Sequence, residues 1–89
     1  MAFKALLNSR LLGSTKSAID RRKEILRILD ENGPKDIAQI IDFLREKPAY
    51  KNLNKKSHMT QIKNDVEYLR ALNLIAEFER EYYLVNQFF

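Results

Sequence analysis

The residues with the clearest capacity for chemistry lie in one basic segment in the second half of the chain. No acidic residue occurs from Lys47 through Asn64, although lysines are frequent there and the whole chain has a net charge of +4. Ammonium groups without acidic neighbours attract phosphate, and amide or hydroxyl side chains among them can pair with DNA bases. A lysine-rich loop that only keeps the protein soluble fits the charge pattern equally well. The candidate DNA-contacting residues are Lys51, Lys55, Lys56, Ser57, His58, Thr60, Gln61, Lys63, Asn64 and, from a later segment, Arg80.

The central candidates fall on one side of a helix that we expect over residues 57–72. In a helix that turns about 100° per residue, the apolar stripe of Ile62, Val66 and Leu69 faces the core and leaves the opposite side polar. The amino-terminal half of such a helix makes most base contacts in a major groove, where Asn and Gln can pair with adenine and a Thr methyl can contact thymine. Ordinary surface polarity is the competing interpretation, but the neighbouring lysines favour base contact. The residues selected in this way are Thr60, Gln61, Lys63 and Asn64.

The start of this helix is the expected phosphate site. Ser57 is the predicted N-cap, so Lys55 and Lys56 lie beside a helix terminus whose dipole and unpaired amides attract an anion. His58 can donate a hydrogen bond to the same phosphate. The interpretation that we favour for His58 is instead a partly buried neighbour of Met59.

Several classes of chemistry are disfavoured by composition. The chain has no Cys, one His and two widely separated Gly, which argues against a disulfide framework, a thiolate zinc site and a phosphate-cradling glycine loop. No nucleophile–base pair and no cluster of carboxylates stands out. We therefore expect no enzymatic activity, no metal and no cofactor. Because no apolar run approaches the roughly 20 residues that span a bilayer, we expect a cytoplasmic or nucleoid-associated protein.

The 89 residues fit one domain in which two further helices precede the basic segment. Apolar spacing predicts helices over residues 15–32 and 36–47, with Gly33 and Pro34 ending the first. The connector that follows is expected to be held to the core by Tyr50 and Leu53. The basic residues of the first helix are expected on its exposed faces, in ion pairs with Asp20, Glu24 or Glu31; they are Arg21, Arg22, Lys23 and Arg27.

A change of period from 3.6 to 2 after Asn73 predicts a β-hairpin at the end of the domain. Asn73 is expected to take a left-handed conformation, and the turn is expected near Glu79 and Arg80. Of Tyr82 and Tyr83, we expect one to face inward and one outward. The alternation places Leu74, Ala76 and Phe78 on one face and Ile75, Glu77 and Glu79 on the other.

The order of these elements resembles the winged helix-turn-helix family of DNA-binding domains over residues 17–86. The quoted segments are ILRILDENGP (25–34), DIAQII (36–41) and TQIKNDVEYL (60–69) followed by LNLI (72–75). The resemblance implies an α+β, mainly α fold in which the 57–72 helix enters the major groove and the hairpin forms the wing. Two features depart from the family pattern. The connector from Lys47 to Lys56 is long, and the wing is acidic, with Arg80 as its only cation.

The function expected on this basis is sequence-specific binding of double-stranded DNA by a small transcriptional regulator. The alternative is a winged-helix module that binds protein within a larger complex. The acidic wing and the modest net charge favour the alternative, whereas the basic segment and the polar helix face favour DNA.

The first 14 residues are expected to form an arm outside the 15–89 domain. They contain no acidic residue, and Phe3, Leu7 and Leu11 repeat at helical spacing. We expect this arm to dock on the core or on a second subunit; a cleavable targeting segment is the weaker alternative. Together with Phe88 and Phe89, the arm is the predicted homodimer interface, unless these residues only complete a small monomeric core.

Overall fold

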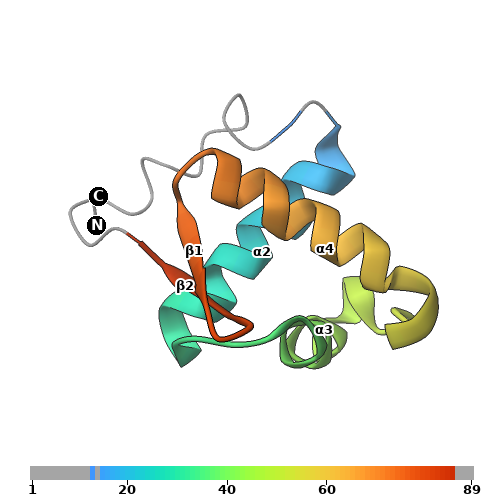
Figure 1. Cartoon of the computed structure of the whole chain (residues 1–89). Helices are drawn as coiled ribbons and strands as arrows, with labels where there is room; N and C mark the ends of the chain where they lie inside the picture. Colours follow the sequence, from blue (N-terminus) through green and yellow to red (C-terminus); the bar gives the residue numbers. More distant parts are fainter. Residues whose placement is uncertain (1–12, 14, 86–89) are drawn as a thin grey trace.

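The computed structural model describes Gly13 and residues 15–85, which fold around one core (Figure 1). The predicted arm over residues 1–14, apart from Gly13, and the predicted contacts of Phe88 and Phe89 lie outside the described residues. The α+β, mainly α arrangement expected from the sequence is confirmed, with the hairpin beside three helices in a winged-helix-like layout. The elements are α2 (Lys16–Asn32), α3 (Ile37–Arg45), the 3₁₀ turn η2 (Pro48–Tyr50), α4 (Lys55–Ala71), β1 (Ile75–Phe78) and β2 (Glu81–Leu84).

Helix α2 begins and ends where its capping residues predict. The Thr15 side chain accepts a hydrogen bond from the Ala18 amide at 3.3 Å, which satisfies one of the free donors of the first turn. Gly33 has φ of 80° and its amide donates to the Leu29 carbonyl. A positive φ is costly for any residue with a Cβ, so glycine at this position stops the helix.

Helix α3 is shorter than expected because of the proline that follows it. Asp36 and Gln39 form a capping box at its start, as is typical of an acidic N-cap. The helix ends at Arg45 rather than at Lys47, since Lys47 is extended, with φ of −89° and ψ of 137°. A residue before proline avoids the helical region. Tyr50 and Leu53 pack against the core, as predicted for the connector.

Helix α4 begins earlier than the sequence predicted. The N-cap is Asn54, not Ser57; its side-chain oxygen accepts hydrogen bonds from the amides of Lys56 and Ser57 at 2.8 and 3.2 Å. Asn and Ser are comparably good N-caps. The choice between them therefore depends on where the preceding connector ends and the helix begins. The extra turn brings Lys55 and Lys56 into the helix itself.

The core is built from apolar residues on the inner faces of all three helices and the hairpin. Burying each such side chain contributes roughly 1.5–3 kcal/mol relative to leaving it in water. The buried stripe predicted for α4 is confirmed, because its three members are fully enclosed. The core residues are Ile25, Leu26, Ile28, Leu29, Ile40, Ile41, Leu44, Ile62, Val66, Leu69, Leu74, Ile75 and Tyr82.

The hairpin has the predicted turn, and of its two tyrosines one faces inward and one outward, as expected. Glu79 and Arg80 have φ of 52° and 69°, the positive values that a two-residue type I′ turn requires. Ile75 and Tyr82 face the core, whereas Phe78 is 67% exposed and Tyr83 is 37% exposed. Both alternating sets contain apolar residues, so alternation alone does not identify the inner face.

Two further contacts fix the hairpin in place. Asn73 has the predicted left-handed conformation, with φ of 62°, and turns the chain from α4 into β1. On the other side, Lys35 and Tyr82 exchange two backbone hydrogen bonds of 3.0 and 2.8 Å. The edge of β2 is therefore covered by the connection between α2 and α3.

Candidate nucleic-acid interface

The position of α4 is set by a buried carboxylate that holds two arginines. Asp65 is 1% exposed, and both of its oxygens accept hydrogen bonds from Arg21, one of them from Arg21 Nη2 at 3.0 Å. Arg22 Nε donates to Asp65 Oδ1 at 2.9 Å. The prediction that these two arginines form exposed pairs within α2 is therefore wrong. Their side chains instead extend from α2 to Asp65 in the middle of α4.

The sequence does carry a signal for this contact. Asp65 lies three residues after Ile62 and four before Leu69, so it falls on the apolar stripe of α4. A carboxylate in that place must find cationic partners, because an unpaired buried charge is very costly. The hydrogen bond to Asp65 raises the pKa of Arg21 above its ordinary value. We call the contact of Asp65 with Arg21 and Arg22 the Asp65 clamp. This clamp fixes the rotation of α4 about its own axis.

A second contact of Arg22 strengthens the same side of α4. Its guanidinium lies over the Tyr68 ring, 4.1 Å from the centroid, within range of a cation–π interaction. Tyr68 is half-buried, as predicted, and serves packing. One side of α4 therefore packs against α2.

The opposite side of α4 is exposed and polar, as predicted from the apolar stripe. At about 100° per residue, its members span an arc of roughly 120° centred near Thr60. Five of them come from the first three turns, where a helix in a major groove makes its base contacts. The exposed residues of this outer face, the α4 outer face, are Lys56, Ser57, Thr60, Lys63, Asn64 and Glu67.

Charge is unevenly distributed along the α4 outer face. Within residues 15–85, neither Lys56 nor Lys63 is in an ion pair. At the other end, Glu67 pairs with Arg70 at 3.1 Å, and Arg70 also contacts Glu77 of β1 at 3.4 Å. The amino-terminal half of the face therefore presents positive charge, while the carboxy-terminal half is neutralised.

The start of α4 is less open to an anion than we expected. Because the Asn54 side chain occupies the Lys56 and Ser57 amides, these donors are not available to a phosphate. A phosphate at this end would have to bind the Lys56 ammonium and the Ser57 hydroxyl. His58 is half-buried, as we favoured, but its Nδ1 accepts a hydrogen bond from the Asn54 amide at 2.9 Å. Only Nε2 remains for another partner.

The remaining candidates are not all brought to this face. Gln61 is exposed on its flank, and Lys51 is exposed in the connector that leads to α4. The side chain of Lys55 lies outside the described residues. Arg80 lies in the turn between β1 and β2, and the hairpin is a separate element from the start of α4 (Figure 1). The structure thus joins the candidates of α4 and leaves Arg80 separate.

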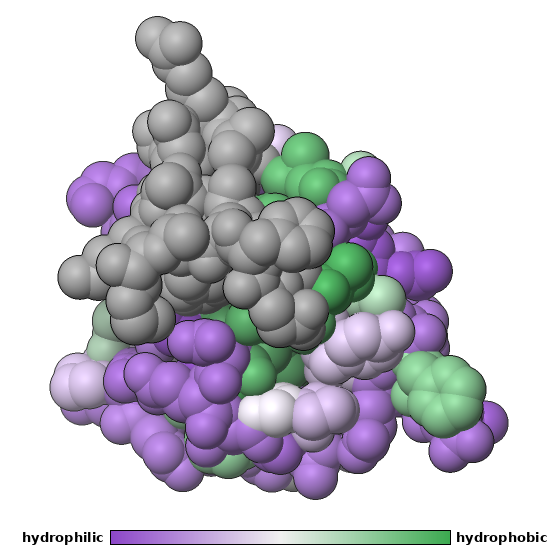
Figure 2. All heavy atoms as spheres, turned by 90° about the vertical axis from the view of Figure 1, so that its left-hand side faces the viewer, coloured by the Kyte–Doolittle hydropathy of each residue, from purple (hydrophilic) through white to green (hydrophobic). Residues whose placement is uncertain are grey.

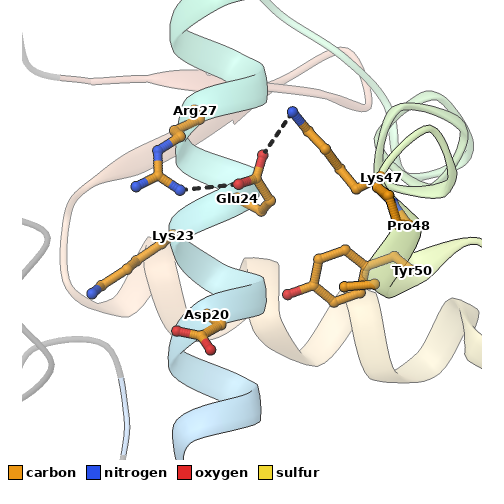
Figure 3. A pocket seen from close by; sticks show the side chains of 8 residues that line it. Asp20, Lys23, Glu24, Arg27, Lys47, Pro48 and Tyr50 are labelled. Atoms are coloured by element: carbon orange, nitrogen blue, oxygen red, sulfur yellow. Dashed lines mark hydrogen bonds and ion pairs between the residues drawn. The ribbon is translucent and has the colours of Figure 1, made fainter.

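Lys47 belongs to the basic segment of the sequence, but its side chain pairs with Glu24 of α2 and is not part of the α4 outer face. It borders a hollow of about 360 Å³ between α2 and η2, where Glu24 lies between Arg27 and Lys47 (Figure 3). The ion pairs are 3.0 Å for Arg27 and 3.7 Å for Lys47. Burial raises the pKa of the Tyr50 phenol on the far wall. Within this hollow, Glu24 is therefore paired with both Arg27 and Lys47.

Comparison of the chain with protein-family models, with curated proteins and with solved structures gave no match. Among the residues that the structure describes, no helix is both long and apolar enough to cross a bilayer. In the same part of the chain, no three acidic or histidine side chains are gathered as a metal ion would need.

Proposed function

We propose that the chain binds double-stranded DNA by placing the amino-terminal half of α4 in the major groove. The observation that carries this proposal is the bare α4 outer face, on which Lys56, Thr60, Lys63 and Asn64 are exposed together. The buried Asp65 clamp holds that face in a single orientation. A helix held in this way, with short polar side chains and with lysines that form no ion pair within residues 15–85, matches the width and the donor and acceptor pattern of a major groove.

Each side chain then has a distinct role. Asn64 pairs with an adenine edge through its amide, and the Thr60 methyl contacts a thymine methyl. Lys56 and Lys63 bind phosphates, or Lys63 reaches a guanine edge. One helix reads only a few base pairs, so a specific regulator would require two copies on half-sites about 34 Å apart.

The hairpin contributes little to DNA binding in this proposal. Glu79 and Glu81 are exposed there, and carboxylates repel phosphate. Arg80 is the one cation of the hairpin that can contact the DNA backbone.

A second candidate function is binding of another protein, and the hairpin favours it. Phe78 is 67% exposed on the same hairpin as those carboxylates. An exposed aromatic side chain of this size is common at protein-binding surfaces.

Titration of a random-sequence duplex at several salt concentrations separates the two candidates. We expect binding at low ionic strength, with a slope of log affinity against log salt of about −0.9 for each phosphate contacted. The double variant Lys56→Ala with Lys63→Ala should flatten this slope by about 1.8. The matched double variant Lys16→Ala with Lys23→Ala, on α2, should leave it nearly unchanged. No salt-sensitive binding by the unaltered chain would contradict the proposal.

A further inference from the structure

The outward face of the hairpin is an apolar surface that the described core does not use. Pro34, Phe78, Glu81 and Tyr83 line a hollow of about 370 Å³ on it. Phe78 pairs with Glu81, and Tyr83 pairs with Ala76, across the two strands. Because residues that pair directly lie on the same face of a sheet, both pairs share the outward face. We name these four lining residues the hairpin patch. Figure 2 shows the side of the molecule that carries the hairpin, where green apolar groups lie among purple hydrophilic ones.

The charge around the hairpin patch restricts what can bind there. Glu79 and Glu81 are exposed beside Phe78, and Arg80 is the only cation of the turn. A segment that binds this patch must supply large apolar side chains and positive charge together, because a neutral or acidic segment would leave the carboxylates without partners.

We propose that residues 1–12 of the same chain dock on the hairpin patch. This segment contains no acidic residue and has two cations, Lys4 and Arg10. By contrast, residues 86–89 have no basic side chain, so charge complementarity does not select them. The apolar residues of the docking segment are Phe3, Leu6, Leu7, Leu11 and Leu12.

Length and tethering favour the chain's own segment over that of a second copy. Gly13 lies beside Ile19 and Arg22, in the first turns of α2. Twelve residues span about 18 Å as a helix and up to about 40 Å when fully extended, whereas the longest dimension of the molecule is 34 Å. A short tether gives an effective concentration on the order of millimolar, above that of a free second copy at ordinary concentrations. This docking does not depend on DNA binding.

A single nitroxide label on the full chain tests the proposal directly. Because the chain has no Cys, Ser9→Cys provides one attachment point within the segment. We expect the backbone amide signals of Phe78 and Glu81 to be lost by paramagnetic broadening, while that of Ser57 at the start of α4 is retained. Loss of the Ser57 signal instead, or no loss at the hairpin, would overturn the proposal.

Two comparisons make the result specific. Adding Phe78→Ser should restore the hairpin signals, whereas Met59→Ser, at a position that is 40% exposed on α4, should not. The same spectra report whether each variant is folded. Mixing isotope-labelled chains without the nitroxide with unlabelled chains that carry it should leave all signals intact. Broadening in that mixture would show that the segment docks on a second copy and would contradict docking within one chain.

Discussion

The α4 outer face and the hairpin patch are both exposed, but they differ in chemistry and in how they are supported. The first presents Lys56 and Lys63 among amide and hydroxyl groups, and the second presents Phe78 between carboxylates. Helix α4 is fixed by a buried ion cluster, whereas the hairpin is fixed by backbone hydrogen bonds to Lys35. The two proposals made above therefore rest on separate surfaces of opposite charge.

The clamp beneath the α4 outer face should give the largest effect when it is broken. Asp65→Asn removes the buried negative charge that Arg21 and Arg22 both contact, and the side chains of these two arginines are 11% and 15% exposed. We expect a loss of about 3 kcal/mol in the free energy of unfolding, since removing one partner of a buried pair strands the other. Urea denaturation measures this loss. The exposed control Asp30→Asn should change stability by less than about 0.5 kcal/mol, and equal losses in the two variants would argue against the clamp.

A smaller effect is expected from a single side chain on the α4 outer face. Asn64→Ala should cost about 1–3 kcal/mol on the preferred DNA site and relax base choice at one position. Gln61→Ala, on the flank, should cost less. Competition binding with single-base variants of a selected site measures both. A larger loss for Gln61→Ala would mean that α4 is rotated relative to our assignment.

The smallest effect is expected from Tyr82, the buried tyrosine of the hairpin, at alkaline pH. Burial raises the pKa of Tyr82, and the nearby Glu77 adds to this, so the unfolded chain, with an ordinary tyrosine pKa of about 10, ionises first. The stability linked to Tyr82 is complete below about pH 10 and is lost as pH rises through its higher folded pKa. Thermal unfolding from pH 8 to 11 should therefore show a weaker alkaline decline for Tyr82→Phe. An unchanged alkaline decline in Tyr82→Phe would contradict this assignment.

Local signals in the sequence predicted most of the elements. Gly33, Asp36 and Asn73 act through their own backbone or capping preferences, so they mark helix ends without reference to the rest of the fold. The exposure of Thr60 and Asn64 followed from helical periodicity. These features depend on neighbours along the chain.

The features that were missed depend on contacts between distant segments. Asn54 and Ser57 are equally plausible caps, so the residue types alone do not choose between them. The inner face of the hairpin is the one whose Ile75 and Tyr82 pack into the core formed with the helices, which local alternation cannot identify. Asp65 was visible as an acid on an apolar stripe, but its choice of partner required the relative placement of α2 and α4.

Mapping a bound duplex onto the backbone amides shows whether α4 is the element that contacts DNA. On addition of a short random-sequence duplex to isotope-labelled protein at low salt, we expect amide chemical-shift changes to cluster at Thr60, Lys63 and Asn64. The amides of Phe78 and Glu81 should change little. Shifts confined to the hairpin, with α4 unaffected, would contradict the assignment of α4 as the DNA-binding element.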